Sequence, residues 1–236
     1  MKNSTILATA ILAGVVAQPA YAQDADPDFF NGVYVGGSFG LDGLDDEAGE
    51  GIVFDTDGDG EYGDTVRTTT GANAFGPGFC NGIANGPRAA DGCSDDKSRF
   101  GYGVRIGFDQ RIGDGPIVAG LLVEGAMSDS EEYSNGFSTT PASYTFKREL
   151  DKSVALRGRL GVSPGSGRGL IYVTGGLAYA DIDHDFITTN GANSFTMTDD
   201  DDWQLGGQIG AGGELYLFDN VSLGLEYLYS RYDDND

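Results

Sequence analysis

The sequence has few basic residues, few prolines and only two cysteines, and its longest apolar run is short. Its 14 lysines and arginines face 37 aspartates and glutamates, which gives a formal net charge of −23 at pH 7. Such a charge repels phosphate backbones, so no nucleic acid is expected as a partner. The 7 prolines, beside 39 glycines without a three-residue repeat, exclude a collagen-like chain. The 39% of hydrophobic residues is too high for a disordered chain and too low for a helical membrane bundle.

The apolar run lies near the N-terminus, at residues 5–17. Lys2 precedes it, and Ala20 and Ala22 follow it with the small-x-small spacing of a signal-peptide cleavage site. The run is shorter than the roughly 20 residues that a membrane-spanning helix needs, although a membrane anchor is the alternative. We therefore predict a secretory signal peptide at residues 1–22 and an exported mature chain at residues 23–236.

The two cysteines would meet an oxidising compartment after export. Cys80 and Cys93 lie in one stretch that is rich in glycine and asparagine. Their even number and short separation favour a local disulfide over two free thiols. The sequence therefore predicts a bridge within a single loop.

Seven segments alternate between apolar residues and polar or small residues, as β-strands with two different faces do. In residues 100–109 the apolar face carries Val104 and Phe108, and Arg105 and glycines lie on the other face. The same alternation occurs at residues 33–41, 117–127, 154–162, 171–179, 203–215 and 221–229. The sequence therefore predicts an all-β fold, an antiparallel up-and-down barrel of which seven strands are visible.

The connections between these strands alternate between long and short. The long connections are acidic and span residues 42–98, 129–150 and 181–202, whereas the short ones carry glycine, proline and asparagine turns. Transmembrane β-barrels show this asymmetry, with short periplasmic turns and long external loops. Aromatic residues near strand ends, such as Phe29 and Phe30, fit an interfacial girdle. We predict a transmembrane barrel; the alternative is a soluble barrel that turns its apolar face inward and carries a ligand.

Three stretches resemble a known family. Residues 154–161 (VALRGRLG), 171–179 (IYVTGGLAY) and 221–229 (VSLGLEYLY) look like strands of the small eight-stranded outer-membrane barrel proteins of the porin-opacity and OmpA-like type. The resemblance implies a barrel in the outer membrane of the bacterial cell. Members of that family usually end on an eighth strand with a terminal Phe, whereas this sequence ends at Asp236. Because such a barrel needs an even strand count, we expect the closing strand to be missing; the alternative is a strand hidden in residues 42–98.

If the apolar faces meet lipid, charged residues of both signs face the barrel interior. They are Arg105, Asp109, Glu124, Arg157, Arg159, Glu214 and Glu226. An eight-stranded barrel is only wide enough for side chains to fill it, and an unpaired buried charge costs several kcal/mol. We therefore predict a lumen charge network that plugs the barrel. A narrow porin-like channel is the alternative.

The first long loop contains a metal-binding pattern. Its carboxylates occupy the first, third and fifth positions of a DxDxDG sequence, the spacing of a calcium loop. Val66 takes the twelfth position in place of the usual bidentate glutamate, so Asp64 would have to substitute. The candidate ligands are Asp55, Asp57, Asp59, Glu61 and Asp64. We predict weak binding of calcium, with a solvated acidic loop as the alternative, and no other cofactor.

The sequence offers little for catalysis. Its single histidine, His184, lies between Asp183 and Asp185, whose charges favour the protonated imidazole over the neutral base that a nucleophile needs. The sequence contains no nucleophile elbow, phosphate-binding loop or zinc-ligand spacing. We therefore predict a non-enzymatic envelope protein with a structural or surface-interaction role. Its expected partners are outer-membrane lipid, lipopolysaccharide and an external surface partner.

Overall fold

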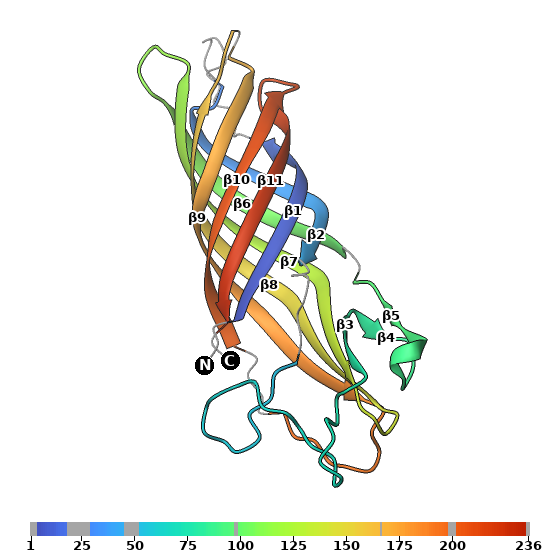
Figure 1. Ribbon diagram of the computed structural model, residues 1–236. Coiled ribbons are helices and arrows are strands. Elements are labelled where there is room, and N and C mark those ends of the chain that lie inside the picture. Colours follow the sequence, from blue (N-terminus) through green and yellow to red (C-terminus); the bar gives the residue numbers. More distant parts are fainter. Residues whose placement is uncertain are drawn as a thin grey trace.

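The computed structural model describes residues 4–17, 29–44, 52–96, 99–165, 167–197 and 202–234. Its main element is a ring of eight antiparallel β-strands (Figure 1). In ring order the strands are β1 (Ser4–Ala17), β2 (Gly32–Leu44), β6 (Arg99–Arg111), β7 (Ile117–Phe137), β8 (Ser143–Val162), β9 (Gly169–Thr188), β10 (Asp202–Tyr216) and β11 (Val221–Asp234). β11 pairs with β1 and closes the ring. The predicted all-β antiparallel barrel is confirmed.

The ring strands contain the seven predicted segments and all extend beyond them, three of the strands by at least eight residues. β7, β8 and β9 continue beyond the other ring strands on the side of the long loops (Figure 1). The predicted loop 129–150 is therefore mostly a hairpin with a turn at residues 138–142, and β9 shortens the predicted loop 181–202. Polar residues extend these strands because opposite charges face each other across them, as Glu132 and Arg148 do.

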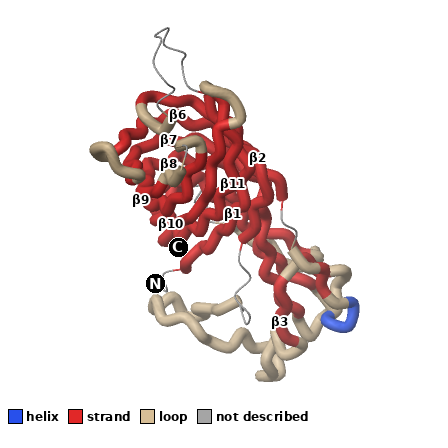
Figure 2. Tube along the Cα trace, turned by 90° about the horizontal axis from the view of Figure 1, so that it is seen from above, coloured by secondary structure: helices blue, strands red, loops and turns tan. Residues whose placement is uncertain are grey.

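Short elements organise the first long loop. They are β3 (Gly78–Asn81), β4 (Ile83–Ala84), a one-turn 3-10 helix (Ala89–Asp91) and β5 (Cys93–Ser94). β3 pairs with the extension of β7, and β4 pairs with β5. Figure 2 shows the loop segments gathered with β3 to one side of the ring. Within the described ranges, no helix is long and apolar enough to cross a membrane.

We use the name outer lobe for the parts that lie beyond the ring on the long-loop side. The outer lobe consists of residues 52–96 and the strand extensions at residues 130–137, 143–150 and 183–188. Its strands continue directly from ring strands, and its first loop is attached through β3. The outer lobe therefore has a fixed connection to the barrel.

The eighth strand comes from a segment that the sequence analysis assigned differently. β1 occupies the place for which we expected a missing strand, and its residues fall within the predicted signal peptide. β1 pairs with β2 on one side and with β11 on the other. Without it, both strands would expose unpaired backbone groups, which are not tolerated in lipid. Within the described part of residues 42–98, no strand after β2 lies between two ring strands, and β3 pairs only with the extension of β7. The predicted cleavage site at residues 20–22 lies outside the described residues, and cleavage stays a prediction.

The two faces of the ring differ in chemistry. Outward side chains are apolar and exposed, with Val104 and Ile171 each 71% exposed. All seven predicted lumen charges lie on the other face and are buried. This arrangement does not fit the soluble alternative, because that alternative requires the apolar face to point inward.

Glycine makes room for large side chains inside the narrow ring. A Cβ atom at Gly107 would lie 2.3 Å from Cζ of Tyr34, and one at Gly212 would lie 2.6 Å from Cζ of Tyr172. Each glycine lies directly opposite its tyrosine on the neighbouring strand. The high glycine content therefore serves close packing in the lumen.

Candidate functional site

The seven lumen charges form two connected groups, and the first lies nearer the short turns. Arg159 donates from Nε to Asp109 at 2.8 Å and from Nη1 to Glu214 at 2.9 Å, and its Nη2 also contacts Asp109. The Ser222 hydroxyl donates to the other oxygen of Glu214 at 2.6 Å. The Arg159 guanidinium also lies 4.7 Å from the ring centre of Tyr34. One guanidinium thus holds two carboxylates and an aromatic ring together.

Arg157 organises the second group. Its Nη2 donates to Glu124 at 2.8 Å and its Nη1 donates to Glu226 at 3.0 Å. Nη1 of Arg105 lies 3.8 Å from Glu226 and 4.0 Å from Glu124. The Tyr172 hydroxyl donates to Glu226 at 2.8 Å. These side chains come from β6, β7, β8, β9 and β11, so the contacts run across the lumen.

Aromatic residues also lie inside the ring at the short-turn end, where sequence reasoning misplaced two of them. Phe29 and Phe30 are buried, and each ring centre lies 4.8 Å from that of Tyr216. The sequence analysis assigned both phenylalanines to a lipid-facing girdle. Both residues precede β2, so they lie outside the alternation of apolar and polar side chains that distinguishes the lumen face from the lipid face. Tyr34, by contrast, follows the inward alternation of β2 and was detectable from it.

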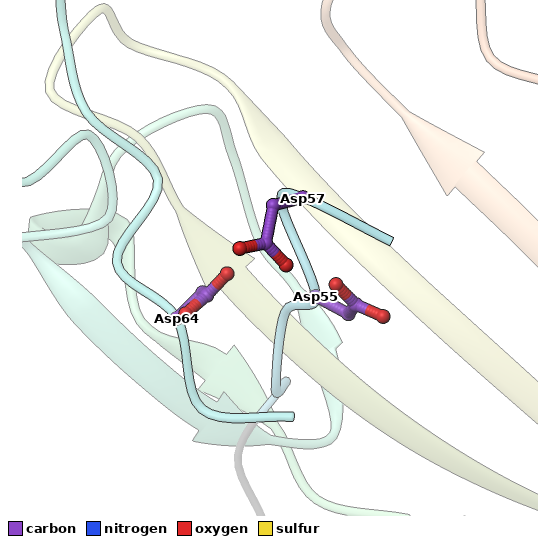
Figure 3. A group of neighbouring side chains, drawn as sticks. All are labelled: Asp55, Asp57 and Asp64. Carbon is purple, nitrogen blue, oxygen red and sulfur yellow. The ribbon is translucent and has the colours of Figure 1, made fainter. Parts of the chain in front are cut away.

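The acidic loop brings three of the five candidate calcium ligands together. One carboxylate oxygen each of Asp55, Asp57 and Asp64 lies within 4.8 Å of the others, and Figure 3 shows Asp64 coming from a separate stretch of the loop. Asp64 is the residue expected to replace the twelfth-position glutamate. Asp59 and Glu61 lie outside this group, and Asp59 instead accepts the backbone N–H of Glu61 at 2.8 Å.

Hydrogen bonds hold two of these carboxylates in their ionised form. Backbone N–H groups of Gly60 and Gly58 donate to Asp55 at 2.9 and 2.7 Å and lower its pKa. The side chain and the backbone N–H of Thr56 donate to Asp64 at 2.7 and 2.9 Å and lower its pKa. An ionised carboxylate is the form that binds a hard cation.

Two kinds of contact attach the first long loop to the strand extensions. Cys80 and Cys93 form a disulfide between β3 and β5, and β3 is itself paired with β7. Phe75 packs against Phe54 and against Tyr144 of β8, with ring centres 4.6 and 5.0 Å apart. The bridge and the rings together fix the loop that carries the acidic cluster.

A comparison with known protein families gives a match over nearly the whole chain. The matching family model is described as an outer membrane protein beta-barrel domain and covers residues 8–236. A search of curated proteins found no match. The outer-membrane location of this family agrees with the exposed apolar face of the ring. The chain belongs to the outer membrane protein β-barrel domain family.

Proposed function

We propose that this protein is a structural and surface-interaction protein of the bacterial cell envelope, with a lumen plugged by its own side chains. The observation that best supports the plugged lumen is the position of Arg157. Its side chain is fully buried and donates to Glu124 of β7 and to Glu226 of β11. A single side chain from β8 therefore connects strands on different sides of the lumen.

The ion pairs supply the energetic argument for a plug. A solute could pass only if the contacts of Arg157 and Arg159 separated. Removing one partner from a buried pair typically costs about 3–5 kcal/mol, and these two arginines each hold two carboxylates. The closed arrangement is therefore favoured strongly over an open one. A narrow porin-like channel is the competing function.

The outer lobe supports the surface-interaction part of the proposal. Its disulfide and strand pairing reduce the conformational entropy that a partner would have to remove on binding. It also exposes aromatic rings, with Phe79 at 42% and Phe146 at 41%, and aromatic rings contribute large contact areas at interfaces. The acidic chain suits an external partner with basic or cationic groups.

Further parts of the proposal concern export and ligands. We expect export through a cleaved signal peptide, contact with outer-membrane lipid and lipopolysaccharide, and no catalytic activity. We also expect Asp55, Asp57 and Asp64 to bind calcium weakly, at roughly the 10⁻⁴–10⁻³ M of extracellular modules.

Conductance in planar lipid bilayers tests the plug. The wild-type chain should give no stepwise current, whereas the double variant Arg157→Ser/Arg159→Ser should give current because it removes both sets of contacts that cross the lumen. Arg99→Ser is the matched control, since Arg99 is exposed and pairs with Glu131 of the outer lobe. Stepwise current in the wild-type chain, unchanged by Arg157→Ser/Arg159→Ser, would favour the channel and reject the plug.

A further inference from the structure

The outward, apolar face of the ring is hollowed near its short-turn end. A groove of about 500 Å³ lies there, over β9, β10 and β11. Gly213 of β10 forms its floor, and Ile171 of β9 and Leu225 of β11 lie directly opposite Gly213 on the neighbouring strands. One step nearer the turns, Leu215 and Leu223 pair across β10 and β11 and line the same groove. Its volume is in the range of small-ligand pockets, roughly 300–1,000 Å³.

Nothing inside the barrel requires glycine at position 213. A Cβ atom there would have the backbone oxygen of Leu170 as its nearest neighbour, at 3.8 Å, which is an ordinary contact distance. The backbone of Gly213 does not have a positive φ either. Gly212 beside it is different, because its Cβ would collide with Tyr172 in the lumen. The missing side chain of Gly213 therefore shapes only the outer surface, and a glycine within a strand often marks the close approach of a ligand.

The spacing of the strands sets the width of the groove. Neighbouring strands lie about 4.8 Å apart, so its walls on β9 and β11 stand roughly 10 Å apart at the backbone. The side chains of Ile171 and Leu225 take up part of that distance, and the space left over Gly213 is about one side chain wide. The next outward residue of β10 is Ala211, which is also small and lies between Val173 and Tyr227. The low floor thus continues along β10, as a ligand lying lengthwise against the barrel wall needs.

The lining selects the chemistry of the ligand. It is almost wholly apolar, and the exposed side chains that form its walls include Ile171 at 71% and Leu225 at 60%. Glu214 contributes to the lining, but its carboxylate is buried and accepts hydrogen bonds from Arg159 and Ser222 in the lumen. The groove is continuous with the apolar outer face, which in this family of outer-membrane barrels meets hydrocarbon. A hydrocarbon chain therefore fits it, and a polar ligand does not.

We propose that this groove binds one acyl chain of a phospholipid on the periplasmic side of the outer membrane. The short turns of such barrels lie on that side, and the groove ends beside the turns at residues 163–168 and 217–220. Burial of apolar surface on both partners supplies the binding free energy. The inference deepens the proposed contact with outer-membrane lipid and rests on it, but it is independent of the plug. The strands that form the groove, β9, β10 and β11, lie outside the predicted signal peptide.

Native mass spectrometry of the full chain tests this site. The protein in detergent micelles is titrated with palmitoyl-oleoyl phosphatidylethanolamine, and the wild-type chain should retain one phospholipid saturably. Gly213→Leu fills the groove and should weaken the apparent affinity at least about tenfold, because a leucine side chain displaces several methylene groups of the acyl chain. Gly207→Leu is the matched control and should leave the affinity unchanged. Gly207 lies on the same strand, is exposed and nearer the long loops, and a Cβ atom there would meet nothing within 4 Å.

A second pair of variants covers the case in which Gly213→Leu does not fold. Leu225→Ala removes a wall of the groove and should weaken lipid binding, whereas Leu205→Ala removes a side chain of similar exposure outside the groove, 58% against 60%, and should not. Phosphatidylglycerol with the same acyl chains should bind equally well. No saturable retention by the wild-type chain, equal losses within each pair, or binding of only one head group would overturn the acyl-chain site. Absence of the protein from the outer-membrane fraction of cells would instead reject the proposed lipid contact itself.

Discussion

Replacing Arg157 by Ala should strongly destabilise the barrel. The side chain is completely buried and makes hydrogen-bonded ion pairs of 2.8 and 3.0 Å with Glu124 and Glu226. Its removal leaves the carboxylates of Glu124 and Glu226 inside the lumen with Arg105 as their more distant counterion. Arg105 lies 3.8–4.0 Å from both and can compensate in part. We therefore expect a loss near the lower end of the usual range for a broken buried pair, about 3 kcal/mol.

Equilibrium unfolding in urea measures this loss. Trp203 is the single tryptophan, is 39% exposed and stacks on Tyr179, so its fluorescence reports unfolding of β9 and β10. Glu124→Gln in the Arg157→Ala background should recover part of the loss, since it removes one of the two stranded charges. A loss below about 1 kcal/mol, or strictly additive effects in the double-mutant cycle, would refute the buried network.

The remaining predictions concern the lipid face, the outer lobe and the N-terminus. Leu121→Arg should lower barrel stability by about 2–4 kcal/mol if it lies near the bilayer midplane, because Leu121 is 62% exposed on the outer face; Leu121→Met is the control, and equal stability of the two variants would contradict a lipid contact. The hydrogen bonds from Gly60 and Gly58 lower the pKa of Asp55, so their contribution should be complete above the ordinary carboxyl pKa of about 3.9 and lost as the pH falls through the lowered value. NMR shifts of the two glycine amides follow this titration, and a midpoint at or above 3.9 would rule out the shift. Calcium titration of the full chain should saturate the amide shift of Asp57 in the range of roughly 0.1–1 mM, and the same shift in Asp57→Asn/Asp64→Asn would return the loop to a solvated acidic segment. Intact mass of the protein extracted from the outer membrane should correspond to a chain starting at Gln23, and a chain that keeps residues 1–22 would make β1 a permanent strand.

The N-terminal measurement also bears on how the ring is closed. β1 is the partner of both β2 and β11. If residues 1–22 are removed, these two strands need another strand between them, because unpaired edges are not tolerated in lipid. If the residues are kept, β1 provides that strand. The mass therefore decides which segment closes the barrel in the membrane.

The sequence by itself determined the barrel class and the inward side of the seven strands that it predicted. A strand has a side-chain period of two, so the alternation around Arg105, Arg157 and Glu226 assigns these residues to one face without any knowledge of the neighbouring strands. The lengths of the connections likewise distinguished the two ends of the barrel. Both inferences depend only on local pattern, and the strands of the structure follow them.

Only the tertiary structure decided which charges meet. Arg157 contacts Glu226 and Arg159 contacts Asp109, and each pair lies on strands that are not neighbours in the ring. Such contacts depend on the width of the lumen and on the stagger of the strands, which no local pattern contains. The same reason explains why the sequence did not predict β1 as the closing strand or the long extensions of β7, β8 and β9. Whether a segment forms a strand there depends on the neighbouring strand with which its backbone pairs.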